Sequence, residues 1–287
     1  MAAAEEAEVP EEGGEMGLRP QSLMLTFLGN YVLGGDAYVY SGSVIDVFGR
    51  AGVSEHATRS TLTRMVGRGL LHRRRVGRRM YFGLTDRAVA ILRDGEDRVW
   101  KQGAVNDSWD GTWTLLAFSL PEASQRQRHG LRAQLAWAGF GPLIGGLWIA
   151  PGRADTEEIT ADLGFGGRVT VFHSTVDPAT DIARMVHETW DLATPAAGYR
   201  AFTDRWSALA DGADDATDTD PLAVKLRLLT EWLVIVRADP HLPVRHLPED
   251  WPAARAQDVF RRADARVDAA AQRLAEELLE TLPAQED

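Results

Sequence analysis

Residues Val53–Thr85 read VSEHATRSTLTRMVGRGLLHRRRVGRRMYFGLT, and the rest of the chain can be interpreted from this stretch outward. Apolar side chains at helical spacing predict a helix that begins after Ser54, a residue type that caps helix N-termini well. Leu70–Arg74 and Met80–Leu84 resemble strands on either side of Gly77, which suits the tip of a hairpin. The stretch therefore predicts a helix followed by a basic β-hairpin.

The charge of this stretch is opposite to that of the whole chain. Between Arg50 and Arg79 nine arginines stand against one acidic residue, whereas the 287-residue chain carries a formal net charge of −11. Such a concentration of one sign costs self-repulsion unless an anionic partner balances it. Duplex DNA has a matching charge density, and a helix followed by a hairpin is the shape of a winged helix-turn-helix. We therefore predict a double-stranded DNA operator as the partner.

The predicted DNA-contacting residues follow from helical geometry and charge. If Leu62 faces inward, a rotation of about 100° per residue places a short polar face on the opposite side of the helix. Arginine on that face can bind guanine O6 and N7 together, so this helix provides the base-edge candidates and the hairpin the phosphate or minor-groove candidates. The full predicted set is Ser54, His56, Arg59, Ser60, Thr63, Arg64, Arg68, Arg73, Arg74, Arg75, Arg78, Arg79 and Tyr81.

An ordinary solvated helix face is the alternative interpretation of the helix taken alone. The hairpin argues against it, because five arginines at a two-stranded tip cannot all find carboxylates locally. These five are Arg73, Arg74, Arg75, Arg78 and Arg79.

Composition limits the other classes of protein. The chain is 45% hydrophobic and 25% charged, as in globular proteins, and its lack of cysteine excludes disulfides and thiolate metal sites and favours a reducing cytoplasm. It has no apolar run of about 18 residues, so no transmembrane helix is expected. Residues 1–18 hold six glutamates and no basic residue, which predicts a disordered acidic tail and not a signal peptide.

The middle of the chain predicts a ferredoxin-like α/β sandwich. Strand patterns occur in Trp113–Ser119, Gly139–Ala150 and Arg168–Ser174, the second of them divided by a glycine turn. Helices are predicted at Ser124–Ala138 and Thr156–Leu163. The resulting order, strand-helix-strand-strand-helix-strand, is that of a split β-α-β unit.

The last third of the chain predicts a mostly helical domain. Asp181–Leu209 reads as helical with a break near Thr194-Pro195, and a mobile acidic loop is expected near 210–220. Ala253–Leu282 is predicted as a long helix whose apolar stripe serves the core, with a dimer seam as the alternative. The stripe consists of Val267, Ala271, Leu274, Leu278 and Leu282.

The predicted fold class is therefore α+β with three domains. The expected boundaries are 1–18 for the tail, 19–100 for the winged helix-turn-helix, 109–178 for the ferredoxin-like domain and 181–287 for the helical domain. Enzymatic motifs are not supported: Gly139, Gly141 and Gly145 surround Pro142, which removes a donor that a phosphate loop would need. We predict neither a cofactor nor a metal site.

Several long motifs together resemble the PaaX family of bacterial transcriptional repressors, named for the regulator of phenylacetate degradation. They are RPQSLMLTFLGNYV, GVSEHATRSTLTRMVGRGLL, RRVGRRMYFGLT, WDGTWTLLAFSLPE, LAWAGFGPLIGGLWIAP and LLTEWLVIVRADPHLPVRHLPEDWPAARAQDVFRR. The resemblance covers nearly the whole chain from Arg19. It implies a cytoplasmic, homodimeric, ligand-released repressor, and it relates the middle domain to a small CRISPR-associated nuclease fold. That nuclease fold needs an Asp near the end of its first strand, where this chain has Phe118-Ser119-Leu120, so nuclease activity is not expected.

The resemblance also implies an acyl-CoA effector of the phenylacetyl-CoA type, whose binding releases DNA. Its phosphates would need cations, and the middle domain offers arginines whose alternative use is surface ion pairing. The candidate effector residues are Arg126, Arg132, Trp148, Arg153 and His173, with Arg128 and Arg168 as further cations. A ligand-independent architectural DNA-binding protein and a metal-dependent nuclease are the competing interpretations.

Overall fold

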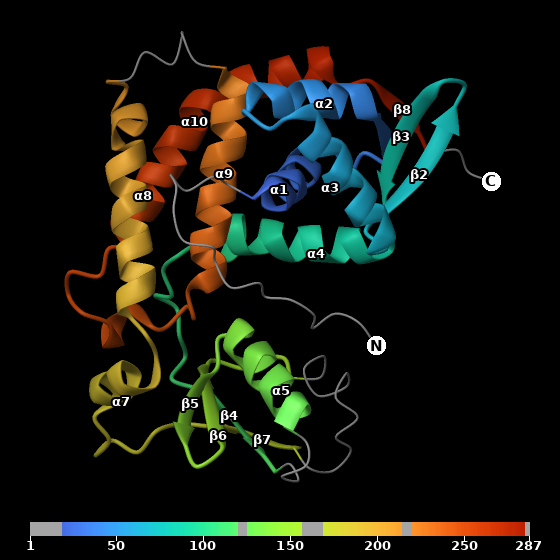
Figure 1. Cartoon of the computed structure of the whole chain (residues 1–287). Coiled ribbons are helices and arrows are strands. Elements are labelled where there is room, and N and C mark those ends of the chain that lie inside the picture. Colours follow the sequence, from blue (N-terminus) through green and yellow to red (C-terminus); the bar gives the residue numbers. More distant parts are fainter. Residues whose placement is uncertain (1–18, 120–124, 157–168, 214–219, 285–287) are drawn as a thin grey trace. The chain divides into compact units, whose positions relative to one another are not determined.

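The computed structural model describes residues 19–119, 125–156, 169–213 and 220–284 (Figure 1). The fold is α+β, as predicted, with two four-stranded antiparallel sheets and a mostly helical C-terminal part. Contacts divide the described chain into two compact units. One, which we call the middle unit, consists of residues 104–199 and 235–254; the other, the N-terminal unit, consists of residues 19–103, 200–234 and 255–284.

The N-terminal unit contains the helix predicted after Ser54 and the predicted hairpin, together with further helices. Ser54 caps the helix that follows it, since its Oγ accepts a hydrogen bond from the backbone N–H of Ala57 at 3.2 Å. Gly77 has a φ of +60°, which the turn of the hairpin requires. The elements are α1 (Pro20–Tyr31), β1 (Ala37–Tyr40), α2 (Ser41–Arg50), α3 (Glu55–Gly67), β2 (Leu71–Val76), β3 (Arg79–Leu84), α4 (Asp86–Asp97) and a π-helical turn (Arg98–Gln102).

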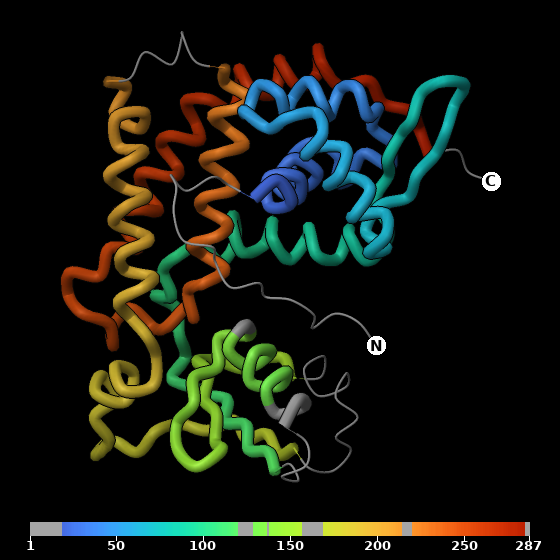
Figure 2. Tube along the Cα trace, in the orientation of Figure 1, coloured from blue at the N-terminus to red at the C-terminus, as the bar shows by residue number. Residues whose placement is uncertain are grey.

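C-terminal helices complete the core of this unit. Leu222 and Leu226 of α9 (Pro221–Ala238) and Ala275 of α10 (Ala253–Leu278) are buried in the same cluster as Phe27 and Leu62. α10 crosses α9 obliquely in the Cα trace (Figure 2), and Trp232 of α9 stacks on Phe260 of α10. The predicted acidic loop near 210–220 and the tail 1–18 lie largely or wholly outside the described residues.

The end of the chain differs from the prediction. α10 stops at Leu278, and Thr281–Pro283 forms strand β8, which pairs antiparallel with β1 so that Leu282 lies opposite Tyr38. Pro283 cannot continue a helix, because it lacks an N–H and its ring clashes with the preceding turn. Pairing also satisfies the backbone groups of β1 that would otherwise form a free edge. The sheet order is β2-β3-β1-β8.

The middle unit packs helices on both faces of its sheet, whose strand order is β5-β6-β4-β7. On one face Leu131 and Leu135 of the first helix pack against Leu116; on the other, Trp113 packs with Val186. The elements are β4 (Trp113–Phe118), α5 (Gln125–Trp137), β5 (Gly141–Ile144), β6 (Leu147–Pro151), β7 (Val169–Ser174), α7 (Ile182–Thr189) and a 3-10 turn (Val244–His246). Most of the predicted helix Thr156–Leu163 lies outside the described residues.

The predicted helix break near Thr194-Pro195 falls slightly earlier. α7 ends at Thr189 and α8 covers Ala193–Asp211, which places Pro195 in the first turn of α8. Proline is tolerated there because the first N–H groups of a helix have no partner within the helix. Asp191 takes up two of these groups: its Oδ1 accepts from the N–H of Ala193 at 2.9 Å and of Thr194 at 3.2 Å.

Candidate nucleic-acid interface

Helix α3 buries one face and exposes the other, as its sequence predicts. Thr58, Leu62 and Met65 are buried in the core of the N-terminal unit. Thr61 is buried as well, at 1% exposure, although the helical pattern did not identify it. Its hydroxyl donates to the carbonyl of Ala57 at 2.8 Å, so a polar side chain can be buried at this position.

The exposed face of α3 carries the predicted base-contacting residues. His56, Arg59, Thr63 and Arg64 are exposed, and Ser60 is half-buried between them. This face is short, polar and arginine-bearing, which is the chemistry that a helix in the major groove requires.

The two arginines of this face are held in different ways. Arg64 donates from Nη1 to Ser60 Oγ at 2.8 Å and from Nη2 to Thr61 Oγ1 at 3.0 Å, so two hydroxyls of its own helix orient its guanidinium. Arg59 forms an i, i+4 ion pair with Glu55, with Nη2 2.7 Å from Oε1. This pair is exposed and screened by solvent, so it contributes little and can give way to another anion.

Arg68, at the C-terminal end of α3, connects the helix to its neighbours. Its Nη1 donates to Gln21 Oε1 of α1 at 3.2 Å, and its carbonyl accepts from Arg87 Nη1 of α4 at 3.2 Å. The side chain remains exposed beside the start of the hairpin. Sequence reasoning did not identify Gln21, because only the fold brings α1 to this end of α3.

The pleat of the hairpin sorts its arginines onto two faces. In the register of β2 and β3, Arg73 lies opposite Phe82 and Arg75 opposite Met80, on the face that continues into the hydrophobic core. Arg74 lies opposite Tyr81 on the other face, which Arg79 shares because it stands two residues before Tyr81. Arg78 occupies the two-residue turn with Gly77 and is exposed.

The second face is a layer of tyrosines and arginines. The Arg74 guanidinium lies 5.9 Å from the centre of the Tyr38 ring, and that of Arg79 lies 5.2 Å from the Tyr40 ring. Cation–π contacts of this kind hold a guanidinium flat against an aromatic surface. Tyr81, predicted to contact DNA, is only 5% exposed and lies within this layer.

Glu280 supplies a carboxylate to the hairpin from 201 residues farther along the chain. Arg79 Nη1 donates to Glu280 Oε1, and the Tyr81 hydroxyl donates to the same oxygen at 2.7 Å. The hydrogen bonds from Tyr81 and Arg79 lower the pKa of the Glu280 carboxyl. The sequence argument was that the five hairpin arginines cannot all find carboxylates locally, and Arg79 finds its carboxylate in a distant part of the chain. Its partner was missed because Glu280 falls within the stretch predicted as helix.

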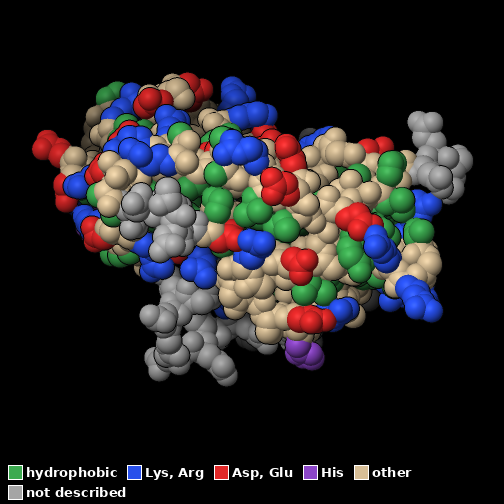
Figure 3. Space-filling view, turned by 90° about the horizontal axis from the view of Figure 1, so that it is seen from above, with side chains coloured by type: hydrophobic (Ala, Val, Ile, Leu, Met, Phe, Trp, Pro, Cys, Tyr) green, Lys and Arg blue, Asp and Glu red, His purple; other side chains and the backbone are tan. Residues whose placement is uncertain are grey.

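Basic residues outnumber acidic ones in the first part of the N-terminal unit. The space-filling view shows Lys and Arg side chains at the right-hand edge, which is the hairpin end in the orientation of Figure 1. It also shows them among acidic side chains over the rest of the visible face (Figure 3). Residues 19–98 hold thirteen arginines and seven acidic residues, so the charge of this segment is opposite in sign to that of the chain.

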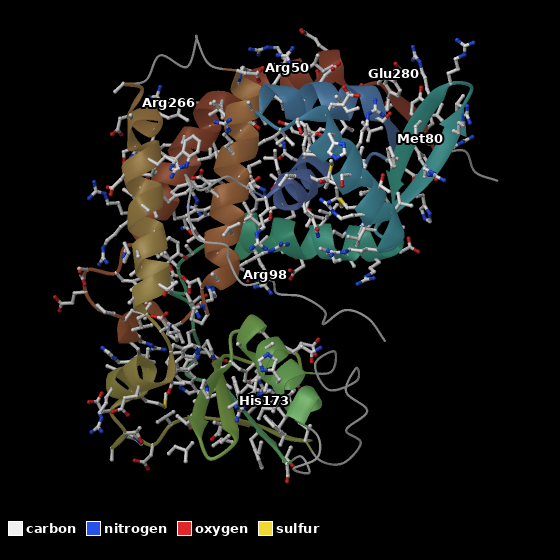
Figure 4. All side chains as sticks on the ribbon, in the orientation of Figure 1. Arg50, Met80, Arg98, His173, Arg266 and Glu280 are labelled. Atoms are coloured by element: carbon white, nitrogen blue, oxygen red, sulfur yellow. The ribbon has the colours of Figure 1, made fainter. Side chains whose placement is uncertain are left out.

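The candidate effector residues of the middle unit differ in their exposure. Trp148 is buried against α5, whereas Arg132 of α5 and Arg153, which follows β6, are exposed. His173, labelled in Figure 4, is exposed on β7, and its Nδ1 lies 3.1 Å from Thr114 Oγ1. The side chains of Arg126, Arg128 and Arg168 lie outside the described residues.

Residues 19–119, 125–156, 169–213 and 220–284 contain neither a cluster of metal ligands nor a membrane-spanning helix. Within these ranges, no group of three or more His, Cys, Asp or Glu side chains is arranged to hold a metal ion. None of the helices there is both long and apolar enough to cross a membrane.

Three consecutive segments of the chain match models of one protein family. Residues 19–88 match the family model "PaaX-like protein", residues 106–186 match "PaaX protein central Cas2-like domain", and residues 190–277 match "PaaX-like protein C-terminal domain". The transcriptional repressor PaaX of Escherichia coli (strain K12) is 27% identical over 248 residues, which is 83% of this chain and 77% of that protein.

A solved structure has the same fold. The uncharacterized protein Rv0674 from Mycobacterium tuberculosis superimposes with a TM-score of 0.60 at 24% sequence identity, covering 91% of this chain and 100% of its own. The three family models follow one another in order and together cover most of the chain. The protein described here is a member of the PaaX family.

Proposed function

We propose that this protein is a sequence-specific transcriptional repressor that binds operator DNA through α3 and the β2–β3 hairpin. One observation carries the proposal: a chain with a net charge of −11 gathers arginines on the exposed face of one helix and on the adjacent hairpin. A polyanionic partner is the physical reason for such a distribution. The relationship to a protein named as a transcriptional repressor supports it.

The proposed DNA reader is a winged helix-turn-helix, with α2 and α3 as the helix pair and the hairpin as the wing. Arg59, Ser60, Thr63 and Arg64 face the major groove, with His56 beside them and Ser54 at the helix start. Arg68, Arg73, Arg75 and Arg78 contact phosphates or enter the minor groove. This assignment rests on the exposed positions of these side chains and on the common geometry of such motifs.

The proposal includes a homodimer. One winged helix reads only a few base pairs, and two copies related by a two-fold axis read a palindromic operator with far greater discrimination. Sedimentation of the protein with and without a palindromic fragment tests this part of the proposal.

A retardation assay on the promoter fragment of the protein's own gene tests the DNA-binding function. The logarithm of the binding constant should fall with the logarithm of salt concentration by about 0.9 for each phosphate contacted. The matched control is a fragment of the same length and base composition with the sequence shuffled. Absence of salt-sensitive retardation, or equal binding to both fragments, would overturn the proposal.

We further propose that a small molecule, an aryl-acyl-CoA such as phenylacetyl-CoA, releases the repressor from DNA. The effector must then favour a state of the protein that binds the operator poorly. Thermal unfolding in the presence of a panel of acyl-CoA thioesters, with free CoA as the control, is the test. An architectural DNA-binding protein without a ligand would show no shift in its unfolding temperature with any thioester of the panel.

The middle unit is proposed to be a ferredoxin-like domain without nuclease activity. Its strand order, β5-β6-β4-β7 with every neighbouring pair antiparallel, supports that fold. The first strand, β4, ends at Phe118 and is followed by Ser119, so this end of the strand lacks the carboxylate that a metal-dependent nuclease would use. Incubation of the protein with plasmid DNA and Mg²⁺ or Mn²⁺ should leave the plasmid intact.

A further inference from the structure

We infer that Glu280, in the segment that follows the last helix, is a positioning residue for the DNA reader: it clamps the β2–β3 hairpin to α2 from the side that faces away from the hydrophobic core. The inference rests on the proposed function and concerns how its binding surface is held. It gives the C-terminal residues 279–284 a role in DNA binding although they need not touch DNA.

The backbone of the clamp is fixed independently of its side chain. The N–H of Glu280 donates to Ser43 Oγ of α2 at 3.0 Å, and its carbonyl accepts from the N–H of Tyr40 at 2.9 Å. Strand β8 follows directly and pairs with β1 along Thr281–Pro283. The backbone of Glu280 therefore has a defined position, bonded to α2 through Ser43 and to β1 through Tyr40.

The side chain of Glu280 reaches the hairpin from that position. Its Oε1 accepts hydrogen bonds from both Arg79 and Tyr81 of β3, while the Arg79 guanidinium also lies over the Tyr40 ring. One residue thus bonds α2 through its backbone and the hairpin through its carboxylate. An exposed ion pair alone would contribute little, but a carboxylate held by two backbone bonds loses less freedom on pairing.

The clamp divides the hairpin arginines into two groups with different roles. Arg74 and Arg79 lie on the tyrosine face, where Tyr38, Tyr40 and Glu280 engage them. Arg73 and Arg75 project on the opposite face, where Arg75 Nε donates, among the described residues, only to the carbonyl of Gly77 in the turn at 3.1 Å, and Arg78 lies at the tip. The second group is therefore available to phosphates, while the first sets the angle of the hairpin relative to α3. Tyr81, buried in the layer, belongs to the first group.

Two matched variants test this with the full-length protein and operator DNA. Glu280→Ala removes the carboxylate, and Glu277→Ala removes the same charge from an exposed position on α10. Compared with Glu277→Ala, Glu280→Ala should bind the operator about 3- to 10-fold more weakly, with the slope of log K against log salt unchanged. If Glu280→Ala instead binds more tightly with a steeper slope, the carboxylate merely masks Arg79 from DNA and the inference is wrong.

A double-mutant cycle separates positioning from general destabilisation. Arg79→Met should weaken binding without changing the salt slope, and the variant carrying both Arg79→Met and Glu280→Ala should be no weaker than the weaker single variant. Arg78→Met, in contrast, should lower the slope by about 0.9 and combine additively with Glu280→Ala. Additivity of the Arg79 and Glu280 effects would overturn the inference.

Hydrogen exchange of the free protein tests the role of Glu280 without DNA, and therefore independently of the proposed function. Amides of residues 71–84 should exchange faster in Glu280→Ala than in Glu277→Ala, while amides of α9 remain equally protected in both. If the hairpin amides respond in this way but the protein does not bind its promoter, Glu280 does hold the hairpin and the proposed DNA-binding function is wrong. Equal exchange of the hairpin in the two variants would exclude the clamp.

Discussion

Arg64 is the residue whose surroundings best match a base-reading role. Its guanidinium is held by Ser60 and Thr61 on the exposed face of α3, so part of its ordering is complete before DNA arrives. Arg64→Ala should weaken binding of the preferred operator by about 1–3 kcal/mol and relax discrimination at one base pair. Competition between the operator and single-base variants measures this.

The matched control for that experiment is an arginine proposed to contact phosphate. Arg75 lies on the core-side face of the hairpin. Arg75→Ala should weaken binding to all DNA sequences by a similar factor and reduce the slope of log K against log salt by about 0.9. If Arg64→Ala leaves operator selectivity unchanged, α3 does not read bases as proposed.

Asp239 gives the middle unit a predictable response to pH. Burial raises the pKa of its carboxyl, although Tyr199 Oη donates to Oδ2 at 2.6 Å and the N–H of His241 donates to Oδ1 at 2.7 Å. A raised pKa means that the folded state holds the proton more tightly than the unfolded chain. The contribution of Asp239 to the free energy of unfolding is therefore complete below the ordinary carboxyl pKa, and it is lost as the pH rises through the raised pKa.

Asp239→Asn should remove this dependence, because the amide stays neutral at every pH. Thermal unfolding midpoints of the wild type should fall from acidic to neutral pH relative to those of Asp239→Asn. Asp250→Asn, at an exposed position, is the control for a general effect of charge. A wild-type midpoint that rises relative to Asp239→Asn over that range would contradict the sign of the argument.

At the scale of the elements, an ion cluster joins α9 to α10, with Lys225 and Asp264 buried and Asp268 exposed. Lys225 is 2% exposed, and its Nζ donates to Asp264 and, at 2.8 Å, to Asp268 of the neighbouring helix. Burial raises the pKa of Asp264, with Lys225 opposing this effect. Lys225→Met would leave Asp264 buried without its cation, so it should cost about 3–5 kcal/mol of unfolding free energy.

Replacing both partners should restore much of that loss. The variant with Lys225→Met and Asp264→Leu buries no charge at the site, and exchanging a buried pair for apolar residues is often neutral. Urea unfolding of the two single variants and the double variant measures the coupling. If the loss of unfolding free energy in the double variant equals the sum of the two single losses, the helices need the ion cluster for packing and not merely for charge balance.

At the scale of the whole molecule, the N-terminal unit depends on C-terminal segments of the chain for its core and its sheet. Buried residues of its core come from α9 and α10, and one edge of its sheet is completed by β8. A fragment of residues 19–103 lacks these contributions and would expose the apolar residues that they cover. We expect it to show no cooperative thermal unfolding and weak near-ultraviolet circular dichroism, unlike the full chain. A fragment that unfolds cooperatively at the midpoint of the full chain would refute this.

Local elements were predictable because their signals are local. The cap at Ser54, the inward face of α3 around Leu62 and the turn at Gly77 depend on neighbouring residues, and each lies where the sequence predicts it. The concentration of arginines is also a property of the sequence alone. The burial of Thr61 was missed because it depends on a hydrogen bond to its own helix.

The sequence by itself determined the helix, the hairpin, the placement of basic residues and, through its motifs, the family. Only the tertiary structure decided which arginines of the hairpin are engaged within the protein, because that depends on β8 pairing with β1 and on Glu280 reaching Arg79 across 201 residues of chain. Periodicity reports the face that a residue occupies within its own element. A partner from a distant strand is fixed only when the backbone groups of a sheet edge are satisfied by pairing, and that requires the complete fold.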